Sequence, residues 1–349
     1  MEFAFDEHQL EFRTQLRALA DKECGPSDIR AAWESPFGWS QSRWESLAEM
    51  GVVGLTVPEP YGGLGLDEVD LVLLLEEAGR AGLPEPLLET TALAVPLLVD
   101  ASGDRAEAAR EEWLPRVASG ETVATVGVCD APGVPAAAGA HLMLLETSGS
   151  IHAVPADAVH QEPLTALDGS WRLARVRWDP SPATLLASGE ESAHLLATTA
   201  DRAALGAAAV LLGVTDRMIA MAAQYAQERR QFGRAIGSFQ AVKHHLSNVL
   251  IGLEFSRPLV YRAAWSVARR TPDASLHASM AKAQASDAAL SAARIALQVH
   301  GAIGYTWEHD LHLWMKRAWS LAAAWGDAPA HRARVLALAA AARSQALPA

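Results

Sequence analysis

Cysteine and positive charge are both scarce in this sequence. Only Cys24 and Cys129 occur among 349 residues, far apart and in no CxxC pair. This excludes a disulfide framework and a zinc ribbon, and we expect a reducing cytoplasmic setting. The formal net charge is −12, so binding of nucleic acid or anionic membrane through broad electrostatics is not expected.

Long apolar runs and targeting signals are also missing. The stretch ETTALAVPLLVDASG is short and contains Pro96, so we expect no membrane span. The N-terminus MEFAFDEHQLEFRTQL carries acidic residues where a signal peptide carries basic ones. The length fits two or three domains of a globular protein.

Hydrophobic periodicity divides the chain into three parts. Residues 1–118 follow a helical pattern, and residues 119–187 consist of short β-prone runs separated by Gly, Pro, Asp and Ser. From residue 188 to 349 the pattern predicts long alanine-rich helices, at about 191–228, 238–269, 276–299, 309–325 and 328–345. The sequence therefore predicts an α+β fold: an N-terminal helical domain, a small antiparallel β domain and a C-terminal helical bundle.

Two stretches resemble ligand sites but do not have the spacing of one. In VPEPYGGLGL, the glycines follow no predicted strand and precede no GK[ST], so we predict a tight turn and no phosphate loop. In QVHGAIGYTWEHDLHLWMKRA, His309 and His312 are three residues apart and His300 lies beyond a glycine turn. This spacing does not bring three ligands to one point, so no metal site is predicted.

Three motifs together carry a family resemblance. VPEPYGGLGL (57–66), QERRQFGRAIGSFQAVKHHLSNV (227–249) and QVHGAIGYTWEHDLHLWMKRA (298–318) resemble segments of the acyl-CoA dehydrogenase family. The helical, β, helical order is similar to that family's plan as well, so the resemblance covers nearly the whole chain. It implies α,β-desaturation of an acyl-CoA thioester with FAD, electron transfer to an electron-transfer flavoprotein, and a tetrameric assembly.

The resemblance also implies which residues contact FAD. The Arg of the ER-x-x-FG motif meets the FAD pyrophosphate across a subunit interface, and here it is Arg229. A guanidinium matches phosphate geometry, although an Arg at this point could also simply end a helix. The family usually has HGG where this chain has HGA. The positions carried over as FAD contacts are Arg229, Gln231, Phe232, Phe239, Gln240, Gln298, Gly301 and Ala302.

The catalytic base of the family is missing from both of its usual positions. By alignment to the family those positions are Ala203 and Trp325 in this chain. Asp201 and Asp327 lie nearby and are the candidates for a relocated base, although Asp327 also suits a helix N-cap. The loops that cradle the flavin ring are absent too, and the β domain is shortened.

These losses lead to three interpretations. In the first, the chain is the non-catalytic partner of a hetero-oligomeric acyl-CoA dehydrogenase of the kind found in actinobacterial steroid and lipid catabolism, and it lends FAD contacts in trans. In the second, it is a complete homo-oligomeric enzyme with a relocated carboxylate. In the third, it is a flavin-free scaffold that keeps the fold. The sequence favours the first interpretation, because the contacts normally lent to a neighbouring subunit are the ones retained.

Overall fold

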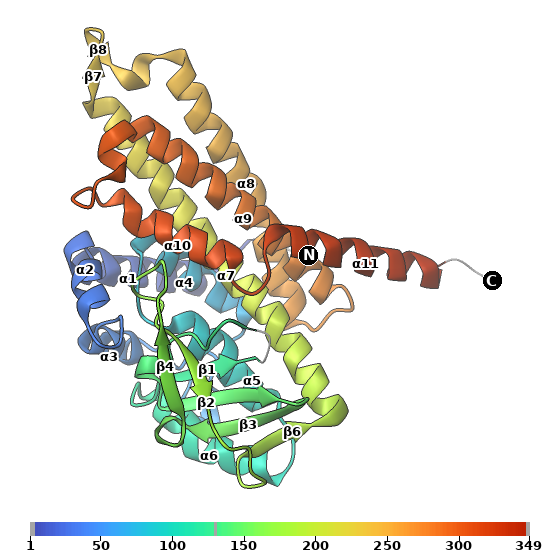
Figure 1. Ribbon diagram of the computed structural model, residues 1–349. Helices are drawn as coiled ribbons and strands as arrows, with labels where there is room; N and C mark the ends of the chain where they lie inside the picture. Colours follow the sequence, from blue (N-terminus) through green and yellow to red (C-terminus); the bar gives the residue numbers. More distant parts are fainter. Residues whose placement is uncertain (1–3, 129–130, 347–349) are drawn as a thin grey trace. The chain divides into compact units, whose positions relative to one another are not determined.

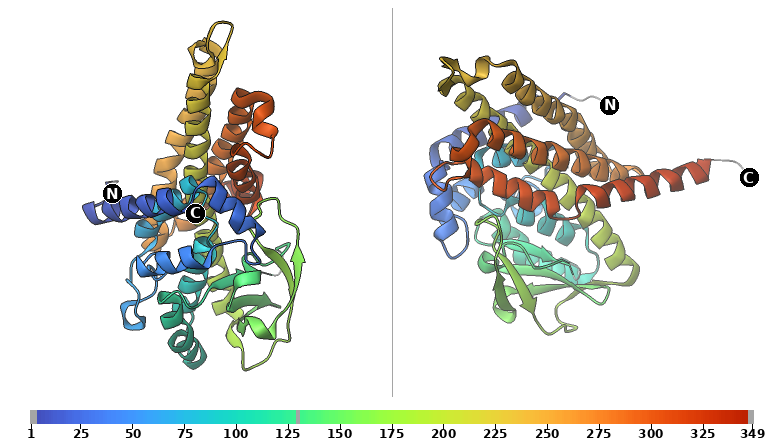
Figure 2. Two further views of the ribbon diagram at one scale, coloured as in Figure 1. Left: turned by 90° about the vertical axis from the view of Figure 1, so that its left-hand side faces the viewer. Right: turned by 45° about the horizontal axis from the view of Figure 1, so that its top comes forward.

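The computed structural model describes residues 4–128 and 131–346, and these form two compact units (Figures 1 and 2). The sheet unit consists of Ser27–Leu71 and Pro84–Ala203; the bundle unit consists of the chain up to Pro26, Val72–Leu83 and the chain from Ala204 onward. Helices α4 (Glu68–Ala81) and α7 (Gly189–Glu228) contribute residues to both units. The predicted division at 118/119 and 187/188 follows element type along the chain and stays a prediction. Cys129 lies outside the described residues.

The sheet unit contains a four-stranded sheet with the order β1-β2-β3-β6. Its strands are β1 (Ala124–Gly127), β2 (Leu142–Thr147), β3 (Ser150–Pro155) and β6 (Leu185–Ser188). The β2–β3 and β3–β6 ladders are antiparallel as predicted, but β1 pairs with β2 in parallel. The prediction of a wholly antiparallel sheet is therefore wrong at this edge, where the sequence separation between β1 and β2 is long enough for a parallel pair.

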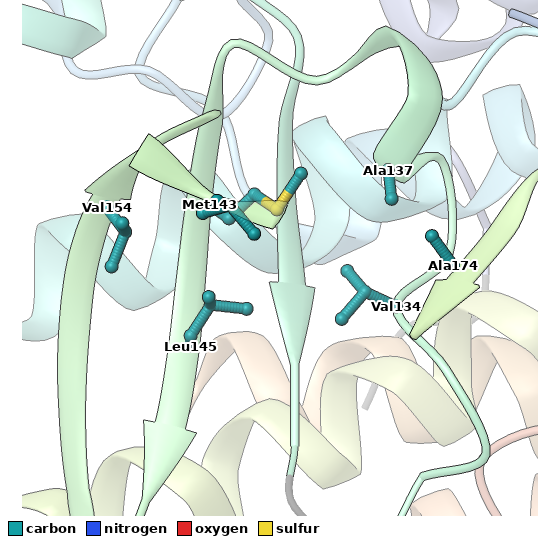
Figure 3. Close-up of a cluster of buried hydrophobic side chains, with 7 residues drawn as sticks. Val134, Ala137, Met143, Leu145, Val154 and Ala174 are labelled. Carbon is teal, nitrogen blue, oxygen red and sulfur yellow. The ribbon is translucent and has the colours of Figure 1, made fainter. Parts of the chain in front are cut away.

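A hydrophobic cluster joins this sheet to the separate β4–β5 hairpin (His160–Leu164 and Leu173–Arg177). Met143 and Leu145 lie two residues apart on β2 and so point to the same face. Figure 3 shows them converging with Val154, from β3, on Val134 and Ala174. Alternation along each strand thus gives the small β region a core of its own.

Four α-helices complete the sheet unit: α2 (Pro26–Glu34), α3 (Gln41–Glu49), α5 (Val95–Asp100) and α6 (Asp104–Ala118). Ser40 caps α3 by accepting a hydrogen bond from the backbone N–H of Arg43 (3.5 Å). The glycine turn after the 3₁₀ turn Glu59–Tyr61 is tight as predicted, because a Cβ at Gly63 would lie 2.1 Å from the Val57 carbonyl oxygen.

A π-helix, η2 (Leu88–Ala94), precedes α5, and all seven of its residues are buried. The Thr90 hydroxyl donates to the Ala124 carbonyl of β1 (2.8 Å), and the Thr91 hydroxyl donates to the Val53 carbonyl (3.0 Å). Helical periodicity does not distinguish π from α geometry over so short a stretch, so the sequence did not predict this segment.

The bundle unit consists of long helices, as the sequence predicts. They are α1 (Glu7–Glu23), α8 (Gln240–Ala268), α9 (Ala274–His300), α10 (Leu311–Ala323) and α11 (Ala328–Ala346), with the last parts of α4 and α7. Within this unit α11 projects away from the other helices (Figures 1 and 2).

Helices α4 and α7 make backbone contact inside the bundle unit. A Cβ at Gly213 would lie 1.8 Å from the Glu76 carbonyl oxygen, and one at Gly79 would lie 2.0 Å from the Val210 carbonyl oxygen. Glycine is thus required on both sides of this crossing, because no side chain fits between the helices.

Helix α7 is the one helix of the described residues that is long and apolar enough to cross a membrane by length and composition. However, 72% of its most apolar stretch is buried inside the protein. A mostly buried core helix passes the same test, so the helix is weak evidence for a span.

Candidate functional site

A two-residue hairpin follows the end of α7 and carries the FG motif. Strands β7 (Arg230–Gln231) and β8 (Arg234–Ala235) pair antiparallel, and the loop residues Phe232 and Gly233 have φ values of 51° and 78°. Positive φ at both positions defines the type I′ turn, which matches the twist of a hairpin. For Phe232 this conformation costs on the order of 1–2 kcal/mol. Its side chain is 90% exposed, so the strain is not offset by burial within this chain.

Arg229 stands at the junction of α7 and this hairpin. Its backbone N–H donates to the Tyr225 carbonyl (2.8 Å), and its side chain is exposed. Beyond the hairpin, the Arg234 guanidinium lies 4.1 Å from the centroid of the Phe239 ring, and Phe232 meets that ring edge to face at 6.1 Å. Arg229 is therefore an exposed cation at the base of a hairpin whose Phe232 ring contacts the Phe239 ring.

The second group of predicted contact residues lies at the end of α9. Gln298, Gly301 and Ala302 are exposed. Gly301 has φ 66° and ψ −143°, and a Cβ placed there would meet nothing within 4 Å. Its backbone therefore faces open space, where another molecule can approach closely.

A ring stack joins the two groups. Tyr225, one turn before Arg229, stacks on His300 with ring centroids 4.5 Å apart and an interplanar angle of 27°. The last turn of α7 therefore lies beside the last turn of α9, and α8 begins at the same end of the bundle unit (Figure 1). The sequence did not single out Tyr225, although its position four residues before Arg229 on a helix places it on the same face.

The remaining predicted contact residue, Gln240, begins α8. Its side-chain amide is 3.1 Å from the His244 Nε2, and both residues are exposed. Lys243 is exposed too.

Large apolar side chains are exposed on the same unit. Phe232 is accompanied by Ile303 (45% exposed), Tyr305 (80%) and Trp307 (58%) from the segment after α9. On α8, Ile251 (53%) and Phe255 (67%) share one helix face. A monomer rarely exposes so many large apolar groups, which is typical of a surface that meets a partner.

The two positions predicted for the catalytic base, Ala203 and Trp325, hold no carboxylate. Ala203, on α7 in the sheet unit, is fully buried, and Asp201 nearby is 6% exposed. Trp325, in the bundle unit, begins the turn before α11 with φ 57°. Asp327 acts as the helix cap that its position suggested, because its Oδ1 accepts a hydrogen bond from the Ala330 N–H (2.9 Å).

Buried polar groups hold the turn at Trp325 in place. Lys282, fully buried on α9, donates to the carbonyls of Ala322 (3.1 Å) and Gly326 (2.9 Å), and His331 Nε2 donates to the Trp325 carbonyl (2.9 Å). The segment is thus rigidly supported although it holds no catalytic carboxylate.

The ring nitrogens of the histidine-rich stretch are engaged with the backbone. His300 Nδ1 donates to the Ala296 carbonyl (2.7 Å), His309 Nδ1 accepts from the Leu311 N–H (3.1 Å), and His312 Nε2 donates to the Trp307 carbonyl (3.1 Å). Burial lowers the pKa of His300, and the neighbouring His309 adds to this. Within residues 4–128 and 131–346 no group of three His, Cys, Asp or Glu side chains could hold a metal ion.

Comparison with known protein families gives two matches. The model of the acyl-CoA dehydrogenase N-terminal domain matches residues 6–121, and the model of the acyl-CoA dehydrogenase C-terminal domain matches residues 194–340. The segment between them contains most of the small β region.

Among curated relatives, acyl-CoA dehydrogenase IpdE2 of Mycobacterium tuberculosis is 34% identical over 316 residues, which cover 90% of this chain and 91% of that protein. Acyl-CoA dehydrogenase FadE34 of the same organism is 35% identical over 334 residues, which cover 92% of this chain but 44% of that protein.

Among solved structures, a variant of the Tcur3481–Tcur3483 steroid ACAD is 26% identical, with a TM-score of 0.87, and 97% of this chain and 99% of that chain are covered. The ChsE4–ChsE5 complex from Mycobacterium tuberculosis shares the fold, with a TM-score of 0.86, 24% identity and both chains fully covered. The matches to the family's N- and C-terminal domains and the identity to IpdE2 show that the chain belongs to the acyl-CoA dehydrogenase family.

Proposed function

We propose that this chain is the partner subunit of a hetero-oligomeric acyl-CoA dehydrogenase, and that it contributes contacts to the FAD pyrophosphate in trans. Enzymes of this family are flavin-dependent oxidoreductases. The observation that carries the proposal is a contrast between two regions: the Arg229 edge is exposed, and both usual base positions, Ala203 and Trp325, lack a carboxylate.

The residues at the Arg229 edge fit one end of FAD. The Arg229 guanidinium makes no ion pair with the described residues, so its donors are available for a pyrophosphate. Phe232 and Phe239 offer apolar cover, and the open backbone at Gly301 allows close approach. Gln231, Gln240, Gln298 and Ala302 complete this proposed contact surface. FAD, when bound, accepts a hydride from the substrate.

Proton removal from the substrate is not supported within this chain. Desaturation needs a base on the face of the acyl group opposite the flavin. Asp327 is engaged as a helix cap, and Asp201 is buried beside Arg202 on the same helix. The carboxylate is therefore assigned to the catalytic partner, and this chain's part is to bind and orient the cofactor.

Two of the compared proteins support such a division of labour. The Tcur3481–Tcur3483 steroid ACAD and the ChsE4–ChsE5 complex are each named for two components. In FadE34, the region similar to this chain is less than half of the polypeptide. A region of this type can therefore be one part of a longer acyl-CoA dehydrogenase chain. By analogy with the steroid ACAD, we place the substrate among the acyl-CoA thioesters of lipid or steroid catabolism. A cytoplasmic tetramer that passes electrons to an electron-transfer flavoprotein completes the proposal.

Expression of the chain alone and with a catalytic homologue that retains the glutamate tests the proposal. We expect the chain alone to purify without stoichiometric flavin absorbance and without acyl-CoA turnover, and the co-expressed pair to show both. Stoichiometric flavin with turnover in the isolated chain would show that it is a complete enzyme. A co-purified pair without flavin would favour a scaffold.

A further inference from the structure

The bundle unit contains a cavity of about 190 Å³ that the proposed flavin site does not use. It lies where the end of α1 and the end of α4 meet α7 and α10. Three charged residues (Asp21, Arg80 and Arg217), the Cys24 thiol and the Trp314 ring line it, together with small or apolar groups.

Arg217 is the unusual member of this lining. Its guanidinium lies over the Trp314 ring, 5.1 Å from the centroid, and its Nε is buried without a hydrogen-bond partner among the described residues. It forms no ion pair with them either. Burial lowers the pKa of Arg217, and the nearby charge of Arg80 adds to this. A partly buried cation without an anionic partner raises the free energy of the folded state unless an anion joins it.

The other charges around the cavity largely neutralise one another. Arg80 binds the Asp21 carboxylate through Nη2 (2.8 Å) and the Glu77 carboxylate through Nε (2.9 Å), and Arg17 supplies a second cation for Glu77. Asp21, Asp310 and Asp216 attract Arg217 from a longer range without forming an ion pair with it, and burial raises the pKa of the Asp216 carboxyl. The charge left without a direct partner is that of Arg217, so the cavity suits a ligand with a single negative charge.

The walls determine the rest of the ligand. Ala20, Ala81 and Pro26 are apolar and small, and they leave space for a short hydrocarbon group beside the cation. We propose that this cavity binds a small organic carboxylate, whose oxygens accept hydrogen bonds from Arg217 and whose short apolar part packs against Ala20 and Ala81.

Cys24 lines the same cavity and can report on this binding. In a Cys129→Ser background the thiol is alkylated with iodoacetate, which is itself a small carboxylate, and with neutral iodoacetamide. In both reactions the sulfur forms a bond to the CH₂ carbon, iodide leaves and the thiol proton goes to solvent. Because Arg217 would hold the carboxylate beside the thiol, we expect the iodoacetate-to-iodoacetamide rate ratio to be about 10-fold or more above that of the unfolded chain.

Two variants distinguish binding at Arg217 from a nonspecific effect of the protein's positive charge. Arg217→Gln should bring the ratio down to that of the unfolded chain, and Arg343→Gln, which removes an exposed arginine on α11, should leave it high. Butyrate should slow alkylation of Cys24 saturably, and the neutral isostere butyramide should not. Equal ratios in the Arg217→Gln variant and its parent, or equal protection by butyrate and butyramide, would overturn the proposal.

If Cys24 reacts with neither iodoacetate nor iodoacetamide, thermal unfolding tests the proposal instead. At matched ionic strength, butyrate should raise the Tm of the parent chain saturably, and this rise should be lost in Arg217→Gln and kept in Arg343→Gln. A rise shared by all three proteins, or by none, also contradicts a carboxylate site at Arg217.

Discussion

The ammonium group of Lys282, on α9, donates a hydrogen bond of 2.9 Å to the carbonyl oxygen of Gly326, in the turn that leads into α11. The same group binds the Ala322 carbonyl at the end of α10 (3.1 Å), and the side chain is fully buried. One side chain thus fixes the end of one helix and the approach to the next. Burial lowers the pKa of Lys282 from 10.5 to about 8, although Asp327 opposes the shift.

This pKa predicts how stability depends on pH. Between about pH 8 and 10.5 the unfolded chain holds a proton on Lys282 that the folded chain has lost, so the free energy of unfolding rises with pH in that window. We expect the wild-type chain to gain up to about 3 kcal/mol relative to Lys282→Met over the window. Urea unfolding of both proteins across this range measures the difference, and parallel curves would contradict it.

The α4–α7 crossing predicts opposite effects of two glycine substitutions. Gly213→Ala would place a Cβ 1.8 Å from the Glu76 carbonyl oxygen, so we expect a loss of about 1–3 kcal/mol or more. Gly252→Ala on α8 is the matched control, because its Cβ would meet only Ala288 at 3.8 Å. There alanine should stabilise the helix by about 0.5–1 kcal/mol. Chemical denaturation of both variants tests the pair, and similar effects would show that the crossing is not close.

The ion pairs of Arg202 in the sheet unit predict a large loss of stability when this residue is replaced. Its guanidinium binds Glu68 and Asp100, each at 2.7 Å, and all three side chains are largely buried. Arg202→Met leaves two carboxylates without this partner, so we expect a loss of about 3–5 kcal/mol at neutral pH.

The loss should be specific to this buried cluster. Unfolding at neutral pH tests this, with Arg105→Met, at an exposed arginine of α6, as the control. A loss of similar size in Arg105→Met would contradict the prediction.

The proposed flavin contact predicts a specific effect of Arg229. In the complex with a catalytic subunit, Arg229→Ala removes charge-assisted hydrogen bonds to a pyrophosphate, so the Kd for FAD should rise about 10- to 100-fold. Arg230→Ala, at the next exposed arginine, should change it little. Fluorescence titration of the deflavinated complex gives both values. Unchanged FAD affinity in Arg229→Ala would exclude the contact in trans.

Helix positions followed well from the sequence because periodicity and caps are local signals. The five predicted C-terminal helices correspond to α7–α11, and Asp327 caps α11 as its position suggested. The parallel β1–β2 pair could not be predicted from the sequence, because the direction of a neighbouring strand depends on the path of the chain between the two strands. The Arg217 cavity could not be predicted either. It depends on how side chains from four helices pack around a guanidinium whose Nε has no hydrogen-bond partner among the described residues.

The π-helix Leu88–Ala94 has a consequence for how this chain can change over evolution. A π segment contains one residue more per turn than an α-helix, and deleting that residue would rotate everything after it by about 100° around the axis. Thr90 and Thr91 would then lose alignment with the carbonyls of Ala124 and Val53 together. The segment cannot be regularised by small successive steps, so its residue count should be inherited unchanged in descendants that keep this fold. The spacing between Glu85 and Asp104 is therefore a lineage marker that can be read from sequence.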